Sequence, residues 1–295
     1  MASQRQVFTL CRLMLYLCSS SCFAVAAAAP NTATSQPLRV VYGSPIGAGP
    51  TTEMYPYKIL KAALDATEQP YRLSPASTDM VQSRVLREIE LGNVDVYWSA
   101  TSKQREQSLL PIRIPLDKGL NGWRLLLIRK TDIARFAALQ SPAAIKSLRM
   151  AQGHDWPDTS LLLHNGFSVQ TAQHPPALFE LLLRQRVDAF PRSVIEAFRE
   201  QQQYPELTVE PHWVLVYPAA VYFFVNRHNT ALAARLELGL ARIKASGEFD
   251  RLFEQRYGES IKAAKLAERQ VIRLENPSIS LDVDDASLWY QVPLP

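Results

Sequence analysis

The sequence predicts an α/β fold whose two lobes, each built on a mostly parallel sheet flanked by helices, face one another across a cleft. The main observation is a pattern that occurs twice. In residues 91–99 and again in 184–192, a helix end and a tight turn lead into a Val-Asp step and a short strand that ends on polar residues. Open α/β sheets bind ligands at the carboxyl ends of their strands. Two such units, one early and one late, therefore predict a two-lobed binder.

The first part of the chain alternates strands and helices. A strand at 38–43 and a turn-rich loop at 44–50 precede a helix at 55–66, a short strand at 71–73, a helix at 81–90 and a strand after Val94. This β-α-β-α-β order favours a parallel sheet.

Prolines in 111–115 and the Asn121-Gly122 pair mark the start of a second lobe. Its predicted elements are a strand at 123–129, a helix at 143–148, a strand at 148–151, helices starting at 158 and 178, a strand after Val187 and a return strand at 213–217. A strand at 222–226 and helices at 230–245 and 249–257, separated by Gly247, complete the first lobe. Two crossings, near Asn121 and Tyr217, give the geometry of a hinge.

These elements divide the chain into four parts. Residues 1–28 are a signal peptide, 38–120 with 221–258 form lobe one, 121–217 form lobe two, and 259–295 form a C-terminal tail that lacks regular periodicity and contains Trp289 and Tyr290. The signal peptide is predicted because Arg5 and Arg12 precede an apolar stretch and a small-residue run that places cleavage near Ala28. The apolar stretch is short for an ordinary membrane span, although a retained anchor is the alternative. The expected location is the periplasm.

Composition excludes several function classes. All three cysteines, Cys11, Cys18 and Cys22, lie in the signal peptide, so the mature chain has no thiol for catalysis or for a metal site. The signal peptide also holds two of the 32 basic residues, which leaves 30 against 28 acidic ones, without the basic run expected of a nucleic-acid-binding protein. The five histidines lack metal-ligand spacing. We expect no cofactor and no metal.

The sequence resembles the family 3 bacterial solute-binding proteins, the periplasmic polar-amino-acid-binding components of ABC transporters. The resemblance extends from about 40 to 257 and rests on the order and spacing of several short pieces. These are Leu91-Gly92-Asn93-Val94-Asp95, residues 99–106, Arg186-Val187-Asp188, and the series Asn229, Leu232, Leu236, Gly247, Phe249, Leu252, Phe253 and Tyr257. It implies a two-lobed periplasmic-binding-protein-like fold of type II, a small-molecule ligand, and an inner-membrane permease or a membrane sensor as partner.

The resemblance also implies site residues in the first lobe. Ser99, Thr101 and Arg105 occupy the positions that hold the ligand's α-carboxylate, although the segment between Asp95 and Arg105 is about two residues shorter than in the family pattern. A guanidinium suits a carboxylate because its planar fork offers two parallel donors.

In the second lobe the sequence departs from the family pattern. Arg192 and Ser193 stand where amino-acid binders place an acidic partner for the ammonium group. A like charge there disfavours an ammonium group, which predicts an anionic ligand or one without a free α-ammonium. The alternative is that Arg192 forms an ion pair with Glu196, four residues on along a helix.

The remaining site candidates lie in a loop and at a strand end. Gln152, Gly153 and Trp156 belong to a strand-to-helix loop whose backbone N–H groups suit an anion, although its last residues also suit helix capping. Trp98 and Trp156 are candidates for lining the cleft, with core packing as the alternative.

We therefore expect an extracytoplasmic solute-binding protein that closes two lobes on a small polar, anionic ligand, for ABC-type transport or for signalling. Two alternatives remain: a periplasmic, dehydratase-like enzyme on the same scaffold, for which His154 and Asp155 are the candidate acid-base groups, and an orphan sensor component that regulates a membrane signalling protein.

Overall fold

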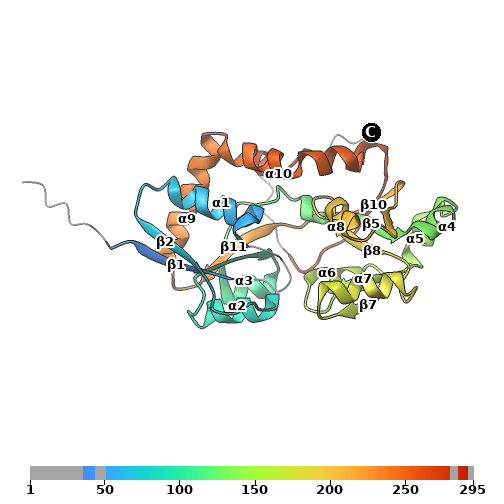
Figure 1. Cartoon of the computed structure of the whole chain (residues 1–295), viewed down its shortest axis with the longest axis horizontal. Helices are drawn as coiled ribbons and strands as arrows, with labels where there is room; N and C mark the ends of the chain where they lie inside the picture. Colours follow the sequence, from blue (N-terminus) through green and yellow to red (C-terminus); the bar gives the residue numbers. More distant parts are fainter. Residues whose placement is uncertain (1–35, 44–50, 280–284, 292–295) are drawn as a thin grey trace, which may run out of the picture. The chain divides into compact units, whose positions relative to one another are not determined.

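The computed structural model describes residues 36–43, 51–279 and 285–291 (Figure 1). The predicted signal peptide, the loop at 44–50 and parts of the predicted tail lie outside these residues. Within them, two five-stranded sheets and one two-stranded sheet are flanked by helices. The first lobe is built on the sheet β2-β1-β3-β11-β4, and the second on the sheet β12-β10-β5-β8, to which β9 adds beside β5, together with the pair β6-β7.

The first lobe places helices on both faces of its sheet. Its strands are β1 (Leu38–Tyr42), β2 (Tyr71–Pro75), β3 (Val96–Ala100), β4 (Leu109–Ile112) and β11 (Val221–Asn226). Helices α1 (Tyr55–Asp65) and α9 (Thr230–Ala245) lie on one side and α2 (Gln82–Glu90) on the other (Figure 1). The apolar stripe of α1 is buried, as its helical spacing predicts. It approaches α9 so closely that a Cβ at Gly239 would lie 2.0 Å from the carbonyl oxygen of Ala63.

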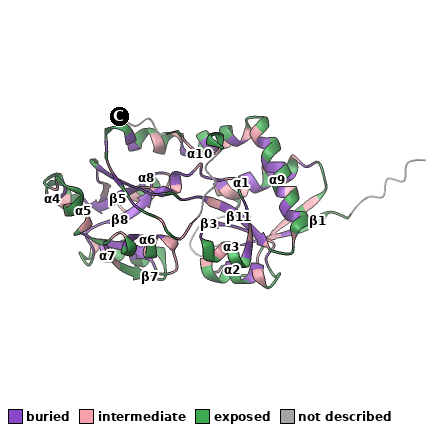
Figure 2. Ribbon diagram, turned by 180° about the vertical axis from the view of Figure 1, so that it is seen from behind, coloured by how far each residue is buried: buried purple, intermediate pink, exposed green. Residues whose placement is uncertain are grey.

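In the second lobe, successive side chains of the central strand point to opposite faces of the sheet, and both faces are buried. Its strands are β5 (Trp123–Arg129), β6 (Arg149–Gly153), β7 (Ser168–Ala172), β8 (Phe190–Ser193), β9 (Leu207–Val209), β10 (Trp213–Val216) and β12 (Gln270–Arg273). Leu126 and Ile128 of β5 pack into one core with α6 (Pro157–His164), while Leu127 packs into another with α7 (Pro175–Leu183). Strands β5 and β8 are accordingly buried (Figure 2).

The remaining helices are short or lie near the crossings. They are α3 (Lys103–Ser108), α4 (Ile133–Ala137), α5 (Pro142–Lys146), α8 (Ala197–Gln203) and α10 (Glu248–Ala264), with 3₁₀ turns at Thr51–Glu53, Leu120–Gly122, Lys130–Asp132, Leu266–Glu268 and Ala286–Leu288. No helix of the described residues is long and apolar enough to cross a membrane.

The repeated Val-Asp step has the same structural role in both lobes. Asp95 donates its backbone N–H to Val41 and accepts the N–H of Val41 through its carboxylate, at 2.8 and 2.6 Å. Asp188 makes the equivalent pair of bonds with Arg149, at 2.8 Å each. In each lobe the aspartate therefore ties the start of one strand to a neighbouring strand. The Val-Asp repeat from which two lobes are predicted is therefore structural. It fixes the start of each strand, and with it the position of the residues at the end of that strand.

The chain crosses between the lobes more often than predicted, since it passes through α10 into β12 of the second-lobe sheet and returns to the first lobe after β12. The two predicted crossings lie between β4 and β5 and between β10 and β11. The buried carboxylate of Asp117 holds them together, since it accepts backbone N–H groups from Gly119 and Asn121 in the first crossing and from Val221 beyond the second. Burial raises the pKa of Asp117 to about 6, although these hydrogen bonds act to lower it.

The structure differs from the sequence prediction in two respects. The sheets are mixed, because β5 and β11, each of which follows a crossing, run antiparallel to their neighbours, whereas β1, β2 and β3 are parallel. In addition, α10 continues to Ala264, and β12 pairs in parallel with β10 where the sequence lacks a strand pattern. After β12 the chain returns to the first lobe, where the carbonyl of Ser278 accepts the N–H of Lys103 at 2.6 Å.

Candidate functional site

Arg105 is held rigidly at the end of β3. It lies in the first turn of α3, whose N-cap Ser102 accepts the backbone N–H of Arg105 at 3.3 Å. Its Nη1 donates to Ser99 Oγ and to the carbonyl of Ala100, both at 2.6 Å. Its Nη2 donates to Gln82 Oε1 at 2.6 Å. The first lobe thus fixes the guanidinium by three contacts to neutral acceptors.

The Arg105 guanidinium also faces the second lobe. Its Nη2 lies 3.4 Å from the carbonyl oxygen of Asp155, in the loop after β6. Among the residues described, no carboxylate oxygen lies within the 4.0 Å of an ion pair with it. Burial lowers the pKa of Arg105, although the negative charge of Asp155 acts to raise it. The positive charge at this strand end is therefore not neutralised by a paired carboxylate.

Thr101 contacts Glu106 and the second crossing and does not contact Arg105 in the described hydrogen bonds. Its hydroxyl donates to Glu106 Oε1 at 2.5 Å, and its backbone N–H donates to the carbonyl of Ala220 at 2.9 Å. The structure thus joins Ser99 directly to Arg105 and uses Thr101 to hold the strand end against the second crossing. Trp98 is buried in the core of the first lobe, where its ring stacks on that of Tyr97 at a centroid distance of 5.4 Å. This agrees with the core-packing alternative.

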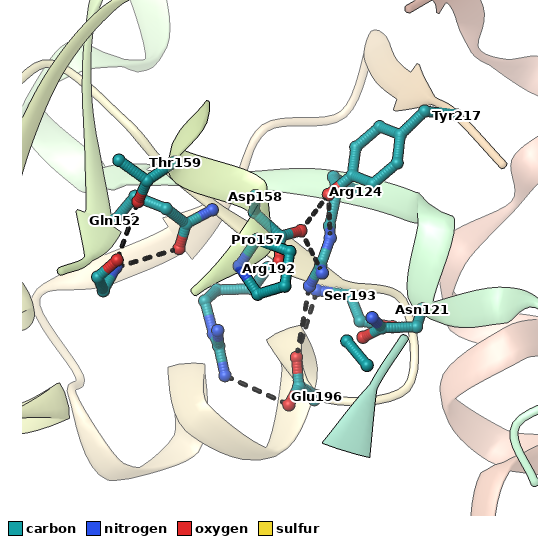
Figure 3. Close-up of polar contacts among 12 residues, drawn as sticks. Asn121, Arg124, Gln152, Pro157, Asp158, Thr159, Arg192, Ser193, Glu196 and Tyr217 are labelled. Carbon is teal, nitrogen blue, oxygen red and sulfur yellow. Dashed lines mark hydrogen bonds and ion pairs between the residues drawn. The ribbon is translucent and has the colours of Figure 1, made fainter. Parts of the chain in front are cut away.

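Strand β6 ends on Gln152 and Gly153, and the loop that follows leads into α6 (Gln152 is labelled in Figure 3). The amide of Gln152 is buried; its Oε1 accepts the N–H of Gly153 at 3.3 Å, while its Nε2 has no hydrogen-bond partner within the part of the chain that the structure describes. A Cβ at Gly153 would lie 2.3 Å from the ring of Trp156, so the glycine permits this packing. Thr159 Oγ1 donates to the carbonyl of Gly153 at 2.7 Å and fixes the turn.

Asp155, from the same loop, connects the two lobes. Its carboxylate accepts the backbone N–H of Ser83 at 3.1 Å, in the first turn of α2. The residue before α2, Val81, gives that helix no side-chain cap, so an opposing loop supplies the acceptor instead. Asp155 and Arg105 therefore mark the place where the two lobes meet.

A buried polar cluster lies beside this loop and near both crossings. Arg124 donates from Nε to the hydroxyl of Tyr217 at 2.7 Å and forms an ion pair with Asp158, to which Tyr217 also donates (Figure 3). Arg124 Nη1 lies 3.6 Å from Glu196. Burial acts to lower the pKa of Arg124, but Asp158 and Tyr217 raise it above its ordinary value. Asp158, in the first turn of α6, thus neutralises a buried arginine.

The predicted roles of Arg192 and Ser193 in the cleft do not agree with their contacts. Arg192 donates from Nε and Nη2 to the two carboxylate oxygens of Glu200, at 2.6 Å each, and lies 3.1 Å from Glu196. Its guanidinium carbon lies 5.1 Å from the ring centroid of Trp156. Burial acts to lower the pKa of Arg192, but Glu196 and Glu200 raise it.

The ion-pair alternative for Arg192 is thus observed, with Glu200 as the bidentate partner. Ser193 donates its hydroxyl to the carbonyl of Leu120 at 2.9 Å, which ties β8 to the first crossing. The rings of Trp156 and Phe190 stack with 6.5 Å between their centroids, and the Arg192 guanidinium carbon lies 5.0 Å from the Phe190 centroid as well. The positive charge of Arg192, from which an anionic ligand was predicted, is therefore paired with carboxylates of the second lobe.

Other chemistry finds little support in this region. Within residues 36–43, 51–279 and 285–291, no group of three or more His, Cys, Asp and Glu could hold a metal ion. The side chain of His154 is exposed. A cavity of about 560 Å³ lies apart from the anchor, between β1 and α2, and is lined by Arg39, Val41, Arg84 and Glu88.

Gln82 is a contact of Arg105 that sequence reasoning missed. Gln82 begins a helix 23 residues before Arg105, and no local pattern joins the two. Glu196, the alternative partner predicted for Arg192, also lies 3.6 Å from Arg124, and 31% of its side chain is exposed.

No protein-family model matches the sequence, and no curated protein matches it. Solved structures are nevertheless similar in fold. A periplasmic binding protein of Salmonella typhimurium with high arginine specificity is 14% identical, with 75% of this chain and 99% of that chain covered and a TM-score of 0.58. A domain of BvgS from Bordetella pertussis is 16% identical, with 74% and 92% covered and a TM-score of 0.58.

An ancestral amino-acid-binding protein, a precursor of cyclohexadienyl dehydratase, is 12% identical, with 74% and 95% covered and a TM-score of 0.58. At these identities the likeness shows the fold alone. The predicted two-lobed periplasmic-binding-protein-like fold of type II is confirmed, and the proteins that share it are mostly binding proteins rather than enzymes.

Proposed function

We propose that this chain is an extracytoplasmic solute-binding protein that closes its two lobes on a small polar ligand carrying a carboxylate. The observation that supports this most is the state of Arg105. Its guanidinium is fixed by neutral acceptors at a strand end, lacks a paired carboxylate among the described residues, and faces the other lobe. A partly buried charge without a counter-ion is costly, and a ligand carboxylate offsets that cost through charge-assisted hydrogen bonds.

The second lobe supplies the remaining ligand contacts in this proposal. Gln152 offers a buried N–H group that has no partner among the described residues, which favours an acceptor oxygen on the ligand. Glu196 offers a partly exposed carboxylate. Because Glu200 and Glu196 neutralise Arg192, its charge no longer disfavours a ligand with an ammonium group. The ligand classes to compare are therefore dicarboxylates, keto acids and amino acids.

Periplasmic location and a membrane partner complete the proposal. The resemblance to family 3 binding proteins and the fold of the solved neighbours support delivery of the ligand to an inner-membrane permease or signalling to a membrane sensor. An enzymatic role is the weaker candidate, because His154 is exposed and Asp155 is engaged by backbone contacts.

The proposal is tested by comparing wild-type protein with Arg105→Ala. A thermal-shift screen of small carboxylates identifies a ligand, since a compound that binds only the folded state raises its melting temperature. Calorimetry should then show that Arg105→Ala loses about 2–5 kcal/mol of binding free energy, as when one member of a charge pair is removed. Arg184→Ala, an exposed arginine of the second lobe, is the control. Wild-type affinity in Arg105→Ala would place the site elsewhere.

Lobe closure gives a second readout. If the two lobes close on the ligand, saturating ligand should lower the radius of gyration measured by small-angle X-ray scattering. An unchanged scattering profile at saturation would indicate a fixed cleft and would count against a closing receptor.

A further inference from the structure

Asp155 takes up the groups that a ligand carboxylate would use at the proposed anchor. Its carbonyl oxygen accepts from Arg105 Nη2 at 3.4 Å, and its carboxylate accepts the backbone N–H of Ser83 at 3.1 Å. A guanidinium and a backbone N–H at a helix start are both donors suited to an anion. Asp155 belongs to the opposite lobe and reaches Arg105 through its backbone carbonyl and Ser83 through its carboxylate, so both contacts exist only when the lobes are close together.

Both contacts are weaker than those that hold Arg105 in place. The bonds from Arg105 to Ser99, Ala100 and Gln82 are each 2.6 Å long, whereas the two bonds to Asp155 exceed 3.0 Å. Long hydrogen bonds are the ones most readily exchanged for shorter ones. A bound carboxylate that replaces Asp155 would leave the first-lobe support of the guanidinium intact.

We propose that Asp155 is a specificity-determining residue that competes with the ligand carboxylate for the Arg105 anchor. The inference rests on the proposed function and adds the ligand's charge. Once displaced, the Asp155 carboxylate remains near the bound ligand, where it repels a second negative charge and attracts a positive one. The cleft thereby selects a carboxylate that also bears a cationic group over a dicarboxylate of similar size.

The test uses two probes of opposite remaining charge, succinate and L-arginine, and three variants. Asp155→Asn removes the charge but keeps an acceptor for Ser83, Asp155→Ala removes both, and His154→Ala changes the exposed neighbour as a control. Each folded protein, checked by circular dichroism, is titrated with both probes by calorimetry at low ionic strength. In both Asp155 variants succinate should bind about tenfold more tightly relative to L-arginine than in wild type, because a charge several ångströms away contributes on this scale. His154→Ala should behave as wild type.

Three results would overturn the inference. The first is an unchanged ratio of the two affinities in both Asp155 variants. The second is a change in Asp155→Ala but not in Asp155→Asn, which would show that the charge is not responsible. The third is failure of succinate to bind either variant at millimolar concentration. Arg105→Ala separates the two proposals: if it abolishes wild-type binding while the Asp155 variants leave the ratio unchanged, the proposed function stands and only the role of Asp155 falls.

Discussion

Arg105 and Arg192 both follow a Val-Asp step, Arg105 in α3 just beyond β3 and Arg192 within β8, and their surroundings are opposite. Arg105 donates to a hydroxyl, an amide oxygen and two carbonyls. Arg192 donates to both oxygens of Glu200 and lies 3.1 Å from Glu196. Arg105 is thus positioned without a paired carboxylate in the part of the chain that the structure describes, whereas Arg192 is both positioned and neutralised.

This difference separates a ligand anchor from a structural arginine. A buried ion pair with good geometry satisfies both partners and leaves nothing for a ligand. A guanidinium held only by neutral acceptors keeps its charge available, as an anchor must. Burial lowers the pKa of Arg105, and the glutamates raise that of Arg192 despite its burial, in line with this division. Asp117 is the anionic counterpart of Arg105, since backbone N–H groups bond it at the crossings.

The largest expected effect is the loss of stability in Arg192→Ala. The substitution leaves Glu200, whose side chain is 13% exposed, without its bidentate partner and removes the cation over Trp156. Stranding one member of a buried pair costs about 3–5 kcal/mol of the free energy of unfolding. Urea denaturation measures this. Arg184→Ala, which breaks an exposed pair with Glu180, should cost less than about 1 kcal/mol. Equal losses in the two variants would remove the contrast on which the comparison depends.

A pH dependence of stability should follow from Asp117. Its pKa is raised to about 6 by burial in the folded chain, whereas the ordinary value is 3.8. Between these values the folded state binds the proton and the unfolded state does not, so the stability gained from protonation is present at low pH and is lost as pH rises through about 6. Two pKa units correspond to roughly 3 kcal/mol.

The Asp117 prediction is checked with Asp117→Asn, which cannot titrate. The free energy of unfolding of wild type should fall relative to that of Asp117→Asn by roughly 3 kcal/mol between pH 4 and pH 7. Parallel curves for the two proteins would mean that the carboxylate has an ordinary pKa at the hinge.

Much of the scaffold could be predicted from local pattern. The helix at 230–245 was predicted at the bounds that α9 has, and β5 at 123–129 likewise, because long periodic or apolar segments specify their own secondary structure. β12 was missed because its pairing depends on β10, more than 50 residues earlier, and a strand of four residues has little pattern of its own.

The site was only partly predictable, for a related reason. Ser99, Thr101 and Arg105 are close in sequence, and the structure brings Ser99 and Arg105 into contact. The sequence did not reveal the main partner that neutralises Arg192. This partner, Glu200, is eight residues away across a turn, beyond the i,i+4 spacing of a continuous helix. Whether a charged group is neutralised depends on tertiary contacts, and those decide which arginine is an anchor.

A smaller effect on stability is expected for Arg105→Ala. The substitution removes hydrogen bonds to Ser99, Ala100 and Gln82 but strands no carboxylate, and the partly buried acceptors can be solvated. The cost should be about 1–2 kcal/mol, below that of Arg192→Ala. The same urea titrations decide the order of the two variants. A loss in Arg105→Ala as large as in Arg192→Ala would show that Arg105 is a structural residue.

The smallest effect on stability should come from Gln152→Met, which keeps the shape of the side chain and removes its polar end. Because Gln152 Nε2 is buried and has no partner within the described residues, its removal should leave the free energy of unfolding unchanged or raise it by up to about 1 kcal/mol. Ligand affinity should fall in the same variant, since the proposal assigns that N–H group to an acceptor on the ligand. Calorimetry with the ligand found in the carboxylate screen measures the second quantity. A variant that loses stability and keeps full affinity would show that the amide supports the loop after β6 rather than the ligand.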